Sequence, residues 1–183
     1  MDKNTLIIGN KKELVHALIR GYLRNDDRII TNQEFTQAGM GADSDNHKSG
    51  TPQNPSVLNV KLNLRSPLSV RSFVLEGLNT FGAIDQAVIS CSLGEENRVL
   101  HDLPVMDIER RIDQEIKGVF FALKEIISFF WKRRKGTVSI VLHTGRASVL
   151  LPLEAAVYGS LKEMTESIFT QYKNEPISII AFE

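Results

Sequence analysis

Tyr158 and Lys162 are the two side chains of this sequence whose types and spacing best suit proton transfer. They stand four positions apart, so on a helix they would share one face, one turn from each other. An ammonium group beside a phenol favours the phenolate and lowers the pKa of the tyrosine. That arrangement suits general acid–base chemistry near neutral pH. The same spacing also fits an ordinary amphipathic helix with a half-buried tyrosine and a solvated lysine.

Other residues that could carry chemistry are sparse. The single cysteine, Cys91, excludes an internal disulfide and is expected to be a small buried residue. His16, His47 and His101 show no metal-ligand spacing, so we predict no metal site. The basic run at 131–135 fits the last turn of a helix, where cations oppose the helix dipole; contact with an anion or nucleic acid is the alternative.

The composition is that of an ordinary globular protein, with 183 residues, 42% hydrophobic and 24% charged. Lys plus Arg and Asp plus Glu both number 22, so the net charge of zero gives no attraction to nucleic acid or an anionic membrane. The most apolar helical stretch, 119–131, is too short to span a bilayer. Since no signal-peptide pattern is present, we expect a cytoplasmic protein, and its neutrality leaves self-association open.

Apolar runs and helical patterns alternate along the chain. We predict strands at 5–8, 28–31, 57–62, 84–90, 137–142 and 177–182. We predict helices at 11–24, 66–80, 106–133 and 154–172. This order predicts the α/β class, with a Rossmann-like doubly wound parallel sheet of about six strands and helices on both faces. We expect one domain over residues 1–183.

Residues 34–56 interrupt the alternation. The part at 35–55 is rich in Gly, Asp, Ser, Asn and Pro, with almost no large apolar residue. Such a segment cannot bury much surface, so we interpret it as a flexible loop standing where a crossover helix is expected.

Several landmarks now resemble, in their order and spacing, the short-chain dehydrogenase/reductase family. Tyr158-Gly159-Ser160-Leu161-Lys162 matches the family's Tyr-x-x-x-Lys. Phe81-Gly82-Ala83-Ile84-Asp85 resembles its lead into the fourth strand, and Gly136-Thr137-Val138 its entry to the fifth. Ile116-Lys117-Gly118-Val119-Phe120 resembles the middle of its long interface helix. The resemblance covers nearly the whole chain, and no single motif in it is specific.

The resemblance implies an NAD(P)-dependent oxidoreductase acting on a small carbonyl or alcohol. In the family the tyrosine donates a proton while hydride arrives from the nicotinamide, and the lysine lowers the tyrosine pKa and holds the ribose. Tyr158 and Lys162 are therefore the implied catalytic pair, and Thr144 or His143 would replace the family serine that polarises the carbonyl. The cofactor would be NADP or NAD, and no acidic residue directly follows the strand at 28–31 to favour a free ribose hydroxyl.

The dinucleotide-binding turn departs from the family's Thr-Gly-x-x-x-Gly-x-Gly. Only Gly9 remains, while Glu13 and Val15 stand at the other two glycine positions. Side chains there crowd a pyrophosphate, and Glu13 adds a negative charge that Lys11 and Lys12 oppose without restoring the room.

Further departures follow along the chain. The family's Asn-Asn-Ala-Gly becomes Ile89-Ser90-Cys91-Ser92, its adenine-pocket aspartate falls near Asn63, and its helix asparagine falls at Glu115. The chain ends at Glu183, before the family's lid and seventh strand, so by resemblance it is a truncated member. The expected cofactor-binding residues are Gly9, Asn10, Lys11, Asn63, Ser90 and Lys162.

Two functions remain open. The first is an oxidoreductase whose cofactor site is degenerate and whose activity is weak or lost. The second is a pseudoenzyme, a non-catalytic interaction or regulatory module that keeps the fold. For both we expect a homo-oligomer, a dimer or tetramer, formed through the helices at 106–133 and 154–172. We also expect an exposed sheet edge at the last strand.

Overall fold

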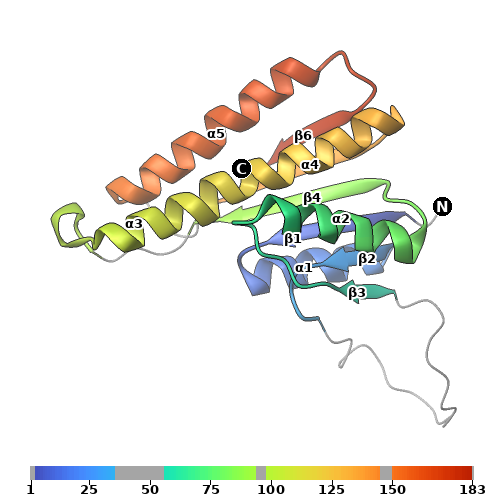
Figure 1. Ribbon diagram of the computed structural model, residues 1–183, viewed down its shortest axis with the longest axis horizontal. Helices are drawn as coiled ribbons and strands as arrows, with labels where there is room; N and C mark the ends of the chain where they lie inside the picture. Colours follow the sequence, from blue (N-terminus) through green and yellow to red (C-terminus); the bar gives the residue numbers. More distant parts are fainter. Residues whose placement is uncertain (1–2, 36–55, 94–97, 145–149, 183) are drawn as a thin grey trace, which may run out of the picture.

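A computed structural model describes residues 3–35, 56–93, 98–144 and 150–182. Its strands form one six-stranded sheet in which every pair is parallel, in the order β3-β2-β1-β4-β5-β6 (Figure 1). This is the strand order of doubly wound dinucleotide-binding folds, so the predicted fold class is confirmed.

The six strands and the helices between them alternate as the sequence predicts. The strands are β1 (Asn4–Gly9), β2 (Arg28–Thr31), β3 (Val57–Asn59), β4 (Gln86–Ser92), β5 (Thr137–His143) and β6 (Ser178–Phe182). The helices are α1 (Lys12–Leu23), α2 (Pro67–Phe81), α3 (Val105–Arg111), α4 (Gly118–Arg133) and α5 (Pro152–Tyr172), with a short 3-10 turn at Leu100–Asp102 before α3.

Local chemistry sets the ends of α2. The Ser66 hydroxyl accepts a hydrogen bond from the Ser69 N–H and so satisfies one of the free donors of the first turn. Pro67 begins the helix, where its missing N–H costs nothing. Gly82 ends the helix with a φ of 74°, a left-handed conformation that glycine adopts without a steric penalty.

Three elements differ from the sequence prediction. The strand expected at 57–62 keeps only Val57–Asn59, and the fourth strand runs on through Cys91 to Ser92. The long helix expected at 106–133 is three segments in line, because a π-helical stretch, Ile112–Lys117, joins α3 to α4. Such a stretch adds a residue to one turn and re-aims the side chains around it.

Different helices cover the two faces of the sheet. Residues of α2, α4 and α5 pack with one face in the larger hydrophobic core, and α4 and α5 lie alongside each other (Figure 1). On the opposite face, α1 packs Val15 and Ile19 against Ile7, Ile29 and Val88.

One residue of the predicted loop at 34–56, Phe35, is part of the hydrophobic core. Phe35 is buried in the α1-side core and meets the His16 ring edge-on at 5.1 Å between ring centroids. Its backbone N–H donates to Asn59 Oδ1 at 3.2 Å. Phe35 therefore belongs to the packed structure, while the rest of the predicted loop, 36–55, lies outside the described residues.

Candidate functional site

The carboxyl ends of β1 and β4 mark the place where the strand order reverses, since β1 pairs with β2 on one side and β4 on the other. In open α/β sheets ligands bind in the crevice at this point. The structure brings three of the predicted cofactor-binding residues together here: Gly9 ends β1, Asn10 follows it, and Ser90 lies opposite Gly9 on β4.

Both backbone groups of Gly9 are bound by side chains that follow β2. Asn32 accepts from the Gly9 N–H through Oδ1 at 3.0 Å and donates to the Gly9 carbonyl through Nδ2 at 3.0 Å. Gln33 Nε2 donates to the same carbonyl at 2.8 Å. Neither residue was predicted from the sequence; two carboxamides placed directly after a buried strand were the available signal.

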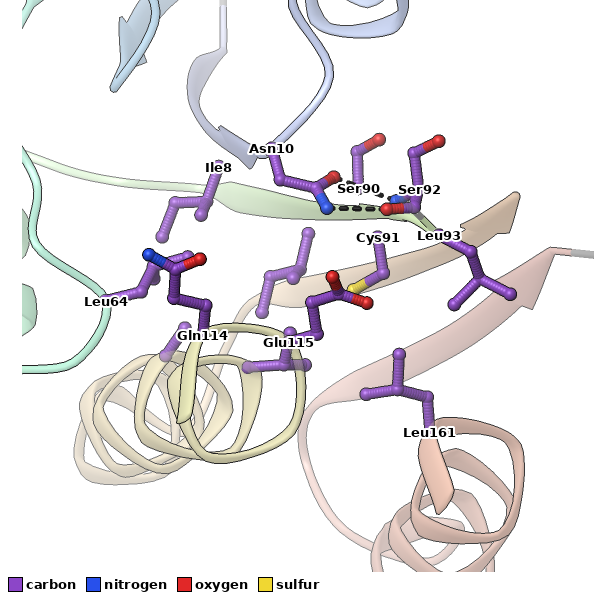
Figure 2. Close-up of a pocket in the computed structure, with 14 residues that line it drawn as sticks. Ile8, Asn10, Leu64, Ser90, Cys91, Ser92, Leu93, Gln114, Glu115 and Leu161 are labelled. Atoms are coloured by element: carbon purple, nitrogen blue, oxygen red, sulfur yellow. Dashed lines mark hydrogen bonds between the residues drawn. The ribbon is translucent and has the colours of Figure 1, made fainter. Parts of the chain in front are cut away.

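A second pair of hydrogen bonds ties the turn after β1 to the end of β4. Asn10 Oδ1 accepts from the Ser92 N–H at 2.9 Å, and Asn10 Nδ2 donates to the Ser92 carbonyl at 2.5 Å. Figure 2 shows the Asn10 carboxamide facing Ser92 across both contacts. Asn10 is therefore engaged with the backbone of its own chain.

Val15 closes the space above Gly9. Its side chain is fully buried, and a Cβ built on Gly9 would collide with the Val15 γ-methyl group. The same Cβ would lie 3.2 Å from the Ser90 Cβ. The glycine at position 9 is thus required by the close approach of α1 and β4.

Lys11 and Glu13 flank the start of α1. Lys11 is the residue before the helix and makes no side-chain capping bond, so the first N–H groups have no cap from this residue. Glu13 is exposed in the first turn, where its charge is favourable for the helix dipole and unfavourable for an anion.

Ser90 and Cys91 line a small cavity under the ends of β1 and β4, together with α4 side chains such as Val119. The cavity measures about 20 Å³, room for about one water molecule. The Ser90 side chain is 2% exposed, and its hydroxyl has no hydrogen-bond partner among the described residues.

Glu115 brings a carboxylate to this cavity from the π-helical stretch. It forms a two-fold ion pair with Arg111, Nε to Oε1 at 3.0 Å and Nη2 to Oε2 at 3.2 Å, and both side chains are largely buried. Figure 2 shows the Cys91 sulfur directed toward Glu115. Burial first, and the Glu115 charge second, raise the pKa of the Cys91 thiol to about 12, so the thiol stays protonated and unreactive.

The predicted catalytic residues lie on α5 and just after β5. Tyr158 and Lys162 stand one turn apart on α5, and both are half-buried. Tyr158 packs against the larger core. Thr144 follows β5, and among the described residues no hydrogen bond joins it to the Tyr158 hydroxyl. His143, the alternative to Thr144, lies with Nδ1 at 3.4 Å from the Ser92 hydroxyl.

Asn63 makes hydrogen bonds within its own turn, next to Leu64, which lines the cavity. Its Oδ1 accepts from the Arg65 N–H at 3.1 Å, and its own N–H donates to the Ser69 hydroxyl at 2.9 Å. These contacts shape the turn that leads into α2.

Neither a metal centre nor a membrane span emerges from the described part of the chain. No group of three or more His, Cys, Asp or Glu side chains there could hold a metal ion. No helix in the same residues is long and apolar enough to cross a bilayer.

Comparison with known proteins gives a structural likeness without a sequence match. No protein-family model matches the chain, and no curated protein matches it in sequence. A structure titled ElxO with NADP bound is 17% identical at a TM-score of 0.78, over 99% of this chain and 72% of that one. A 3-ketoacyl-(acyl-carrier-protein) reductase from Brucella melitensis complexed with NADH is 14% identical at 0.78, over 98% and 74%. A short chain dehydrogenase/reductase from Burkholderia phymatum in complex with NAD is 11% identical at 0.75, over 98% and 64%.

Proposed function

We propose that this chain, which has the fold of the short-chain dehydrogenases/reductases, is a non-catalytic homodimeric module with a degenerate dinucleotide site. The observation that carries the proposal is the turn between β1 and α1. A pyrophosphate at such a turn needs backbone that it can approach closely. Here Val15 fills the space over Gly9, and Glu13 places a carboxylate in the first turn of α1. These residues do not fit a dinucleotide.

The chemistry of the crevice supports the same proposal. The backbone groups of Gly9 are taken by Asn32 and Gln33, and the Asn10 carboxamide is taken by Ser92. The family's interface-helix asparagine is here Glu115, whose charge is committed to Arg111. The Cys91 thiol, whose pKa is raised to about 12, offers no nucleophile.

An oxidoreductase is the second candidate, and one observation favours it. Tyr158 and Lys162 lie one turn apart on α5, a spacing that suits general acid–base catalysis by a tyrosine with a neighbouring lysine. In that case Tyr158 donates the proton, Lys162 assists it, and Thr144 or His143 polarises a small carbonyl substrate. The structural neighbours titled with NADP, NADH or NAD bound support a nicotinamide cofactor for this candidate. The cofactor would be NADP or NAD: Asn32 rather than an acidic residue follows β2, so nothing at that position favours a free ribose hydroxyl.

Calorimetric titration of the purified chain with NADPH and NADH tests the proposal. We expect no binding heat at millimolar cofactor and no rise in melting temperature, because a ligand that binds only the native state must stabilise it. Micromolar binding of either dinucleotide would overturn the proposal.

Turnover assays then separate the two candidates. Carbonyl reduction that is lost in Tyr158→Phe and kept in Tyr172→Phe would establish the oxidoreductase. Tyr172 is the matched control because it lies on the same helix, where it packs against Trp131 at 6.0 Å between ring centroids. Equal activity in wild type and Tyr158→Phe would remove the role assigned to Tyr158.

A further inference from the structure

Four backbone groups stand at the carboxyl ends of β1 and β4, where a ligand of this fold would seek them. They are the N–H and carbonyl of Gly9 and the N–H and carbonyl of Ser92. Each of the four is bound by a carboxamide of the same chain: Asn32 binds both groups of Gly9, and Asn10 binds both groups of Ser92. Gln33 adds a second donor to the Gly9 carbonyl.

These contacts form two clamps. The first, Asn32 on Gly9, joins the segment after β2 to the end of β1. The second, Asn10 on Ser92, joins the turn after β1 to the end of β4. Together they tie β2, β1 and β4 at the point where the strand order reverses. Each clamp uses one N–H and one oxygen lone pair of a carboxamide, so each asparagine is oriented toward the backbone of its own chain.

We propose that the two carboxamide clamps fix the carboxyl ends of β2, β1 and β4 to one another without any ligand. They do so in the place where a dinucleotide would otherwise bind the strand ends. The inference extends the proposed function and rests on it for the absence of a bound dinucleotide. Val15 supports this arrangement of the strand ends because it lies directly against Gly9 and leaves no room between α1 and β1.

Hydrogen exchange of the ¹⁵N-labelled protein tests each clamp at its own amide. In Asn32→Ala we expect exchange of the Gly9 amide to accelerate at least tenfold while the Ser92 amide stays protected. In Asn10→Ala the pattern reverses. Each variant loses two hydrogen bonds, so its melting temperature should fall by about 4 to 8 °C. Asn25→Ala removes an exposed carboxamide of the same type and should change neither amide.

The same variants show whether a ligand can take the place of a clamp. Millimolar NADPH should restore neither the protection nor the melting temperature. Restoration of both the amide protection and the melting temperature in Asn32→Ala would overturn the inference, since the strand ends would then accept a dinucleotide. If Asn32→Ala does not fold, Asn32→Asp keeps the acceptor for the Gly9 N–H and should leave that amide protected.

The outcomes also separate this inference from the proposed function. Rapid exchange of Gly9 and Ser92 in wild type, or unchanged melting in both alanine variants, would overturn the clamps even if no dinucleotide binds. Dinucleotide binding by a wild-type protein whose two amides remain protected would overturn the proposed function alone.

Discussion

Gly9 lies under the γ-methyl group of Val15, and a Cβ at position 9 would collide with it. In dinucleotide-binding folds the third glycine of the turn allows close helix–strand packing. Here valine stands at that helix position, and the strand residue is the one without a side chain. The close approach of helix and strand is therefore made possible by the glycine on β1, and not by a glycine on α1.

This arrangement makes Gly9→Ala a costly substitution. We expect the free energy of unfolding to fall by about 2 to 3 kcal/mol, since overpacking of a rigid contact costs about that much. In the double variant Gly9→Ala, Val15→Ala the two effects should not add, because the colliding methyl groups have been removed. Urea denaturation of Gly9→Ala, Val15→Ala and the double variant measures the three free energies of unfolding.

Gly21→Ala is the control for this prediction. Gly21 lies in α1, and a Cβ there meets nothing within 4 Å, so alanine should stabilise the helix by up to about 1 kcal/mol. Additive costs at positions 9 and 15 would show that the two residues do not compete for the same space.

Among the elements, the π-helical stretch between α3 and α4 has a measurable effect on its neighbour β4. It carries Glu115, whose carboxylate raises the pKa of the Cys91 thiol beyond the effect of burial alone. The pKa rises from 9.0 to about 12 on folding, so between these values the unfolded chain loses a proton that the folded chain keeps. The contribution to stability is fully present below pH 9 and is lost as the pH rises toward about 12.

We therefore expect the wild-type free energy of unfolding to fall with rising pH relative to Cys91→Ala, by up to about 4 kcal/mol over the whole window. Denaturation of both proteins at several pH values between about 8 and 11 measures the difference. Glu115→Gln should reduce this pH dependence of the free energy of unfolding without abolishing it. Parallel pH dependences of wild type and Cys91→Ala would contradict the assigned pKa.

The sequence predicts the elements better than their irregularities. All six strands and the helices between them are where period and capping signals place them, including the Ser66 cap and the Gly82 stop. The π-helical stretch was not predicted, because its residues carry the same apolar spacing as an unbroken helix. β3 is shorter than its alternating pattern: Val57–Asn59 pair with β2, and beyond them the Val60 N–H donates a last hydrogen bond to the Thr31 carbonyl.

The sequence places three candidate residues at one point of the fold, and their role in cofactor binding stays a prediction. Gly9, Asn10 and Ser90 do meet at the reversal point. Asn32 and Gln33 were missed, because their role depends on β1 and β2 lying side by side, which spacing along the chain does not reveal. The roles of Tyr158, Lys162 and Thr144 stay predictions.

At the scale of the whole molecule, α4 and α5 present an apolar outer face. Phe120 and Trp131 on α4 are 53% and 39% exposed, and Phe169 on α5 is 52% exposed. Between the two helices lies a groove lined by residues such as Ile127, Ile168 and Tyr172. Exposed aromatic side chains of this kind are typical anchors of protein interfaces.

We expect the protein to sediment as a dimer of twice its 20.5 kDa mass and Phe120→Glu to raise the dimer dissociation constant about 30-fold or more, because a charge replaces a buried anchor. Phe182→Glu is the matched control: it makes the same change at an equally exposed phenylalanine on β6, away from this face. A monomer at all concentrations, or equal weakening by both variants, would contradict an interface at α4 and α5.

The central place of β1 also bears on how the chain is made. β1 leaves the ribosome well before its partner on one side, β4, which begins only at Gln86, and the register joins Thr5 to that residue. At synthesis rates of about 5 to 20 residues per second, β1 has no partner on its β4 side for roughly 4 to 16 s. The nascent chain passes through this interval with its most buried strand half-paired, and a pairing so distant in sequence is slow to form.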